Sequence, residues 1–181
     1  MAEQKIRFVA PIIRAALASL QAGFAAHVAT FNTEAENLVD LTAPAAYVFG
    51  ATDVMDDYPV VEAAILRGTV GPFSVGTAGV GDADSTPALQ VIVWLQGVTG
   101  EVPGLYEAGL GYARCVIEIL TVDGALGDTA EVSGSREDAI SYSVEGPIPQ
   151  SPDDVDREFR KWKIPIVIDF LVEAVDHWVA A

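Results

Sequence analysis

Residues 88–98 read ALQVIVWLQGV, the strongest strand signal in this chain. β-Branched and aromatic residues are enriched in strands, where their side chains pack on a pleated surface. A strand with one wet face would alternate polar and apolar residues, but this run is almost continuously apolar. It therefore predicts a strand buried on both faces, which requires partner strands and further layers.

Two segments with helical periodicity can supply such a layer. Apolar residues recur every three or four positions over residues 4–31, which are rich in Ala. We expect a long amphipathic helix that starts or kinks at Pro11. A second helix is expected over residues 104–120 and ends near Gly124. Its apolar stripe consists of Leu105, Leu110, Ala113, Val116, Ile117 and Leu120.

Further strands are expected at 46–50, 60–66, 139–145 and 159–172. Pro165 favours an edge or bulged position for the last of these strands, because proline donates no backbone hydrogen bond. Residues 68–87 are rich in Gly, Thr and Pro and predict a flexible loop. A short helical tail is expected over residues 171–181, which include the C-terminal tail 173–181 of the domain.

This order of elements predicts an α+β fold in one domain, residues 1–181. A single, mostly antiparallel (mixed) sheet would pack against two main helices.

The charge balance excludes several classes of protein. The chain has 26 acidic and 10 basic residues and a net charge of −16. Tight grip on nucleic acid or anionic membranes needs Lys and Arg, so neither is expected. No uncharged apolar run approaches about 18 residues, and Arg14 interrupts the N-terminal one, so we expect no membrane span and no signal peptide. The single cysteine allows no intrachain disulfide and fits a reducing cytoplasm.

Residues with catalytic potential do not form a known pattern. His27 and His177 lack the spacing of a metal motif. Cys115 lies in the apolar part of the second helix, where a buried, inert thiol is expected. Glycines at 76–81 have neither the order of a dinucleotide loop nor the Lys of a nucleotide loop. We therefore expect no catalytic, cofactor-binding or metal site, and no enzymatic activity.

The segment 151–163 is bipolar, with an acidic cluster directly followed by a basic one. Such a segment suits self-association, in which acids of one subunit meet bases of the next. Local surface ion pairs worth under about 1 kcal/mol each are the alternative, and the sequence leaves both open. The predicted interface residues are Asp153, Asp154, Asp156, Arg157, Arg160, Lys161 and Lys163.

Several local sequences follow one another in a familiar order along residues 4–172. After the N-terminal helix come Asp57-Tyr58-Pro59-Val60-Val61-Glu62, Val91-Ile92-Val93-Trp94-Leu95, a helix with Tyr106, Tyr112-Ala113-Arg114 and Ile117, and Leu120-Thr-Val-Asp123-Gly-Ala-Leu126-Gly127-Asp128. In this order the chain resembles the tail terminator (tail completion) and related neck proteins of long-tailed bacteriophages.

The resemblance implies a structural, non-enzymatic virion protein without a cofactor, assembled in the host cytoplasm. Its copies would form a ring, commonly a hexamer, on the head-proximal end of the tail tube. The ring would stop tube polymerisation and present a docking surface to the head–tail connector or stopper protein. Residues 68–87 would be an interface or lumen arm. DNA would pass through without specific binding, and an acidic lumen would repel its phosphates.

Three other interpretations remain. The long acidic loops and extended C-terminus depart from the pattern and leave open which neck component the chain is, so another head–tail connector or neck protein is an alternative. Charge alone supports an acidic DNA mimic that inhibits a nucleic-acid-binding protein. A small enzyme or ligand-binding domain would need a convergent polar pocket with perturbed titrating groups.

Overall fold

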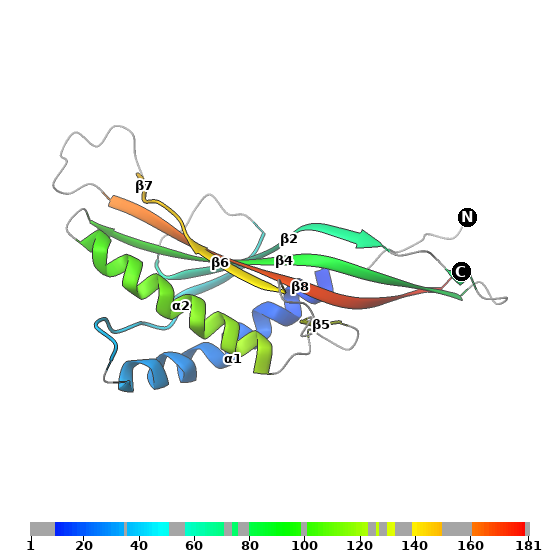
Figure 1. Ribbon diagram of the computed structural model, residues 1–181, viewed down its shortest axis with the longest axis horizontal. Coiled ribbons are helices and arrows are strands. Elements are labelled where there is room, and N and C mark those ends of the chain that lie inside the picture. Colours follow the sequence, from blue (N-terminus) through cyan, green and yellow to red (C-terminus); the bar gives the residue numbers. More distant parts are fainter. Residues whose placement is uncertain are drawn as a thin grey trace.

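The computed structural model places two helices on one face of a mixed sheet, as Figure 1 shows, which confirms the predicted α+β fold. It describes residues 10–34, 36–50, 57–70, 74–75, 80–98, 101–122, 126, 130–132, 139–149 and 161–179. The helices are α1 (Ala10–Thr33) and α2 (Val102–Val122). The strands are β1 (Ala46–Phe49), β2 (Val60–Val70), β3 (Ser74–Val75), β4 (Val80–Val98), β5 (Ala130–Val132), β6 (Ile140–Val144), β7 (Ile148–Pro149) and β8 (Lys161–Val179).

The strand order is β1-β2-β4-β8-β5, with β6 and β7 also paired to β8 and β3 paired to β4. Only β1 and β2 are parallel; every other pair is antiparallel. The prediction of a mostly antiparallel, mixed sheet is therefore confirmed.

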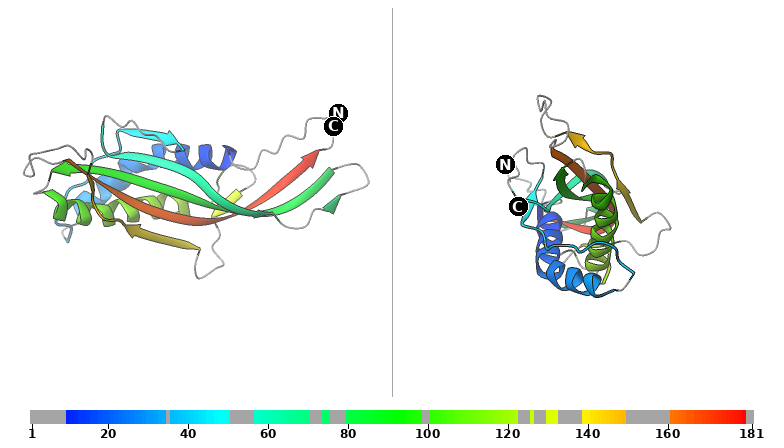
Figure 2. Two further views of the ribbon diagram at one scale, coloured as in Figure 1. Left: turned by 90° about the horizontal axis from the view of Figure 1, so that it is seen from above. Right: turned by 90° about the vertical axis from the view of Figure 1, so that its left-hand side faces the viewer.

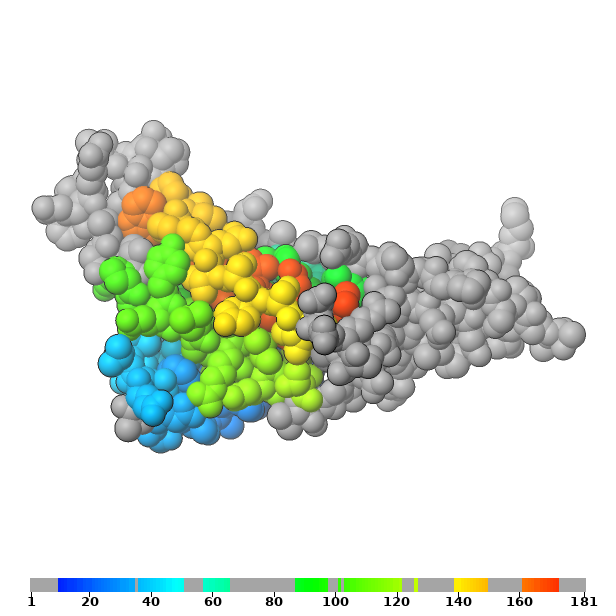
Figure 3. Space-filling view, in the orientation of Figure 1, coloured from blue at the N-terminus to red at the C-terminus, as the bar shows by residue number. Residues whose placement is uncertain are grey.

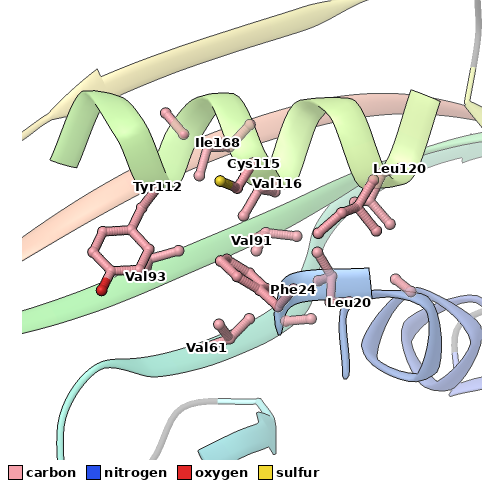
Figure 4. Close-up of a cluster of buried hydrophobic side chains, with 14 of the residues drawn as sticks. Leu20, Phe24, Val61, Val91, Val93, Tyr112, Cys115, Val116, Leu120 and Ile168 are labelled. Atoms are coloured by element: carbon pink, nitrogen blue, oxygen red, sulfur yellow. The ribbon is translucent and has the colours of Figure 1, made fainter. Parts of the chain in front are cut away.

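The hydrophobic core lies between the helices and one face of the sheet. Alternate residues of the two central strands point into it, because side chains alternate between the faces of a strand. Figure 4 shows Phe24 and Leu20 of α1 meeting Val91 and Val93 of β4. The buried side chains of the central strands are Leu89, Val91, Val93 and Leu95 of β4 and Ile164, Ile166, Ile168, Phe170 and Val172 of β8.

Burial of residues 88–98 on both faces was predicted, and that prediction is wrong. Ala88, Gln90, Ile92, Trp94 and Gln96 alternate with the buried residues and are only half-buried. No described helix packs on them, since both helices lie on the other side of the sheet (Figure 2, left). Apolar residues on the second face hid the alternation in the sequence.

Helix α1 confirms the predicted amphipathic helix within residues 10–33. Its buried stripe consists of Ile12, Ile13, Ala16, Leu20, Phe24, Val28 and Phe31. By length and hydropathy α1 is also the one described helix that could cross a membrane, which the charge-based reading did not anticipate. Core helices of globular proteins meet the same criterion, and the apolar stripe of α1 is buried in the core of this protein.

The two helices approach closely at two glycines. A Cβ atom on Gly23 of α1 would lie 3.1 Å from Cγ1 of Ile119 in α2. A Cβ atom on Gly111 of α2 would lie 2.7 Å from Cζ of Phe31 in α1. The missing side chains thus set the spacing of the helix pair.

The predicted loop at 68–87 is wrong wherever the structure describes it. β2 continues to Val70, β3 occupies 74–75, and β4 begins at Val80. β4 spans about 60 Å, against about 36 Å for α1, so β2, β4 and β8 run on beyond the helices (Figure 1). Pairing of 80–85 with 174–179 of β8 overrides the local preference of the Gly-rich sequence.

Two predictions for the C-terminal region are also corrected. β8 continues to Val179, so no helical tail forms over 173–179. β8 is also an interior strand, not an edge strand, despite Pro165. The Pro165 carbonyl accepts a hydrogen bond from the Glu145 amide, which lies between β6 and β7. The backbone nitrogen of a strand residue points to the same side as its carbonyl, so the Pro165 nitrogen also faces the gap between β6 and β7. The missing donor therefore falls where the ladder is already interrupted.

Candidate functional site

The predicted interface segment is only partly described. Asp153, Asp154, Asp156, Arg157 and Arg160 lie outside the described residues. Lys161 and Lys163 begin β8, where Lys161 is exposed and Lys163 is half-buried. Whether acids and bases of this segment meet across subunits stays a prediction.

Lys163 belongs to the sheet face opposite the helices, which we call the open face. Its Nζ atom lies 5.6 Å from the centroid of the Tyr58 ring. This distance allows a cation–π contact. The Tyr58 hydroxyl is buried and has no hydrogen-bond partner within the described part of the chain. Tyr58 and Lys163 thus form an aromatic–cation pair at one end of the open face, and the Tyr58 hydroxyl makes no hydrogen bond to the described residues.

Two segments that carry the resemblance meet on the open face. Glu62 of β2 lies beside Ile92 of β4 in register, and its side chain is 5 % exposed. The Trp94 indole Nε1–H donates a hydrogen bond of 3.0 Å to Glu62 Oε2. The contact satisfies a carboxylate that would otherwise be buried at high cost.

A second polar pair lies further along the same face. Gln90 Nε2 donates a hydrogen bond of 2.9 Å to Asp169 Oδ1, across the β4–β8 register. Each pair is joined by one hydrogen bond within the sheet. A partner that covered the open face would therefore leave the Trp94 indole donor paired. Apolar residues surround the two pairs: Val60, Ala64, Ala88, Ile92, Pro165, Val167 and Leu171.

A cluster of charged side chains joins the C-terminal part of α1 to the C-terminal half of α2. Arg114 contacts Glu34 through Nη1 at 2.6 Å and Glu118 through Nε at 2.7 Å. His27 Nδ1 lies 3.2 Å from Glu118 Oε2. Hydrogen bonds from Arg114 lower the pKa of both carboxyls and raise the pKa of the guanidinium. The cluster is largely exposed, so its ion pairs link the two helices but add little stability.

Cys115 lies on the buried side of α2, as predicted. Burial raises the pKa of its thiol to about 11. Since the thiolate is the reactive form, this cysteine is inert near neutral pH. Across the described residues, no group of three or more His, Cys, Asp or Glu side chains is placed to hold a metal ion.

A shallow hollow of about 420 Å³ lies between α1 and β1. Its walls combine apolar surface with one cation and one amide, contributed by Arg14, Leu17, Ala18, Gln21, Tyr47 and Phe49. Sequence reasoning assigned no role to these residues. Phe49 is 53 % exposed although it ends an apolar strand run, and β1 lies at an edge of the sheet.

The sequence matches no protein-family model, and a search of curated proteins found no match.

Proposed function

We propose that this chain is a structural subunit of a long-tailed bacteriophage neck, a tail terminator (tail completion) protein. Its copies form a ring on the head-proximal end of the tail tube, stop tube polymerisation and present a surface for head–tail joining. The proposal rests on the resemblance described above and on one structural observation, the one-sided layering of the sheet.

That observation is that no described helix covers the second face of the sheet. Among the described elements, helices cover one face only, and β2, β4 and β8 extend past them (Figures 1 and 2). The open face is largely apolar, and its polar groups bond one another. Its side chains Ala88, Ile92, Val167 and Leu171 are half-buried, so a further layer of protein can pack on them, which supports an assembly subunit.

The resemblance segments also support the proposal by their positions. Glu62 and Trp94 bond on the open face, and Tyr58 contacts Lys163 there. Tyr112 instead donates a hydrogen bond of 2.7 Å to the Thr42 carbonyl, which fixes the chain leaving α1 against α2. Two of the segments therefore meet on the open face, and the helix segment with Tyr112 stabilises the subunit.

Light scattering and negative-stain microscopy of the purified protein test the proposal. We expect ring particles, and we expect them to cap one end of tail tubes added to the sample. A protein that stays monomeric and caps no tubes contradicts the proposal. Tight, salt-sensitive binding of that monomer to a basic nucleic-acid-binding protein would favour the DNA-mimic interpretation instead.

A further inference from the structure

Exposed apolar side chains gather at the two edges of the sheet. Five large apolar side chains are exposed within the described residues, and three of them belong to outermost strands. These are Phe49 of β1, Tyr142 of β6 and Ile148 of β7, which are 53, 56 and 45 % exposed. The edges lie on opposite sides of the sheet, β1 in cyan and β6 in olive (Figure 2, left).

The backbones of β1 and β6 are open on their outer sides. β1 pairs with β2 alone, and β6 pairs with β8 alone, within the part of the chain that the structure describes. Figure 3 shows β6 and β7 in yellow along the surface beside the green α2. Each outer edge offers a row of backbone donors and acceptors to another strand.

Neither strand carries the residues that usually protect an edge. β1 reads AYVF and β6 reads ISYSV, without a charge or a proline. Natural edge strands are commonly guarded by Lys, Pro or bulges. β7 is guarded in this way, since it contains Pro149. The chain has a net charge of −16, which makes most of its surfaces repel one another. β1 and β6 are of similar length and carry no charge, so they can approach each other without that repulsion.

The side chains of the two edges match face by face. Phe49 lies in register with Ala63 and Tyr142 with Ile168, both core residues on the helix side of the sheet. Phe49 and Tyr142 therefore both point to the helix side. On the open side, β1 presents Ala46 and Val48, and β6 presents Ser141 and Ser143.

We propose that β6 of one copy adds to β1 of the next copy and continues the sheet from subunit to subunit. Tyr142 then packs beside Phe49 over the hollow between α1 and β1, where Leu17 and Ala18 offer apolar contact. This inference rests on the proposed function, since it takes self-assembly as given and names the strands that carry it.

The strand directions agree with this joint. β1 is parallel to β2, β2 is parallel to β8 through β4, and β6 is antiparallel to β8. Copies related by rotation about an axis along the strands would therefore pair β6 and β1 antiparallel, the slightly more stable arrangement. Two different edges meet at each joint, so the contact is heterologous, and such contacts generate rings when the rotation closes.

The test places a single charge on each edge. Phe49→Lys and Tyr142→Lys each leave one edge intact, and both sites are exposed enough to keep the subunit folded. We expect each variant alone to need at least about tenfold more protein for assembly, because an unpaired lysine is buried at the joint. An equimolar mixture should form a 1:1 dimer through the two intact edges and stop there. Leu38→Lys, at a residue 85 % exposed, is the control and should assemble normally.

The assembly measurements should be made in about 0.3 M salt, because salt screens the repulsion between acidic subunits. Rings that form undiminished from both lysine variants would overturn the edge pairing and leave the proposed function standing. A wild-type chain that never self-associates would overturn both.

Cysteine crosslinking tests the same joint while leaving Phe49 and Tyr142 unchanged. The double variant Val48→Cys, Ser143→Cys should give a ladder of covalent oligomers on mild oxidation, whereas Val48→Cys alone should not. Assembled rings without any ladder from this variant or from Val48→Cys, Ser141→Cys would contradict the pairing.

Discussion

The two faces of the sheet differ in how their side chains are packed. On the helix face, Val91 and Val93 are fully buried among apolar neighbours from α1 and α2 (Figure 4). On the open face of the same strand, Gln90 and Trp94 hydrogen-bond to acidic residues of the neighbouring strands. The helix face therefore supplies most of the apolar burial of the subunit, whereas the open face combines hydrogen-bonded polar pairs with half-buried apolar side chains.

The largest effect should come from truncating the helix face. Phe24 is fully buried, and its ring centroid lies 6.3 Å from that of Tyr47 and 6.1 Å from that of Tyr112. We expect Phe24→Ala to lower the free energy of unfolding by about 3–5 kcal/mol, since it removes transfer energy and leaves a cavity. Urea denaturation measures this, with Leu38→Ala as an exposed control that should change little. A loss similar to that of the control would show that the core is not where the structure places it.

A smaller loss is expected at the crossing of the two helices. A methyl group on Gly111 would meet the Phe31 ring and also Leu41 Cδ1 at 3.0 Å. Gly111→Ala should therefore destabilise the protein by about 1–3 kcal/mol through overpacking. Gly104→Ala is the matched control in α2, because nothing lies within 4 Å of its added Cβ. The control should be neutral or stabilise by up to about 1 kcal/mol, since Ala favours helix over Gly; equal effects at both sites would contradict the close approach.

On the open face, the cost should come from an orphaned charge. Trp94→Phe removes the indole N–H and leaves the Glu62 carboxylate without that donor, which should cost about 1–3 kcal/mol of stability. Adding Glu62→Leu should recover much of this loss, because the orphaned group is then gone. Denaturation of the two single variants and the double variant gives the coupling energy. Additive effects would show that the hydrogen bond contributes nothing.

The smallest effect concerns the exposed cluster around Arg114. Glu34 and Glu118 have pKa values below their usual value because of Arg114, so they bind protons less readily when folded than when unfolded. This stability is present above the ordinary carboxyl pKa of about 4.5 and is lost as the pH falls through the lowered values. Arg114→Gln should therefore flatten the decline of melting temperature with acidification below about pH 4.5. An unchanged acid limb would exclude this cluster as its source.

Periodicity predicted most of the elements but not how far the strands extend. α1, α2, β1 and β6 lie close to their expected residues, because apolar spacing follows the faces that they bury. The Gly-rich part of β4 and the end of β8 were missed, since each is a strand only because the other pairs with it. Leu110 was also misplaced: it continues the apolar spacing of α2 but is 54 % exposed.

The candidate surfaces were less accessible to sequence reasoning. The strands that contain Glu62 and Trp94 were identified, but their contact joins residues 32 positions apart, and no local pattern encodes it. Phe49 and Tyr142 looked like ordinary strand residues. Their exposure depends on β1 and β6 being edges, which is a property of strand order.

By itself, the sequence determined an α+β subunit with two amphipathic helices, a mostly antiparallel sheet, an inert cysteine and a strongly acidic surface, because composition and periodicity are local quantities. Only the tertiary structure decided that Pro165 lies in an interior strand, that no described helix covers the second face of the sheet, and that the uncharged strands β1 and β6 lie at its edges. Those features depend on which distant segments pair, and the backbone hydrogen bonds and burial gained by pairing outweigh the local preferences of the residues involved.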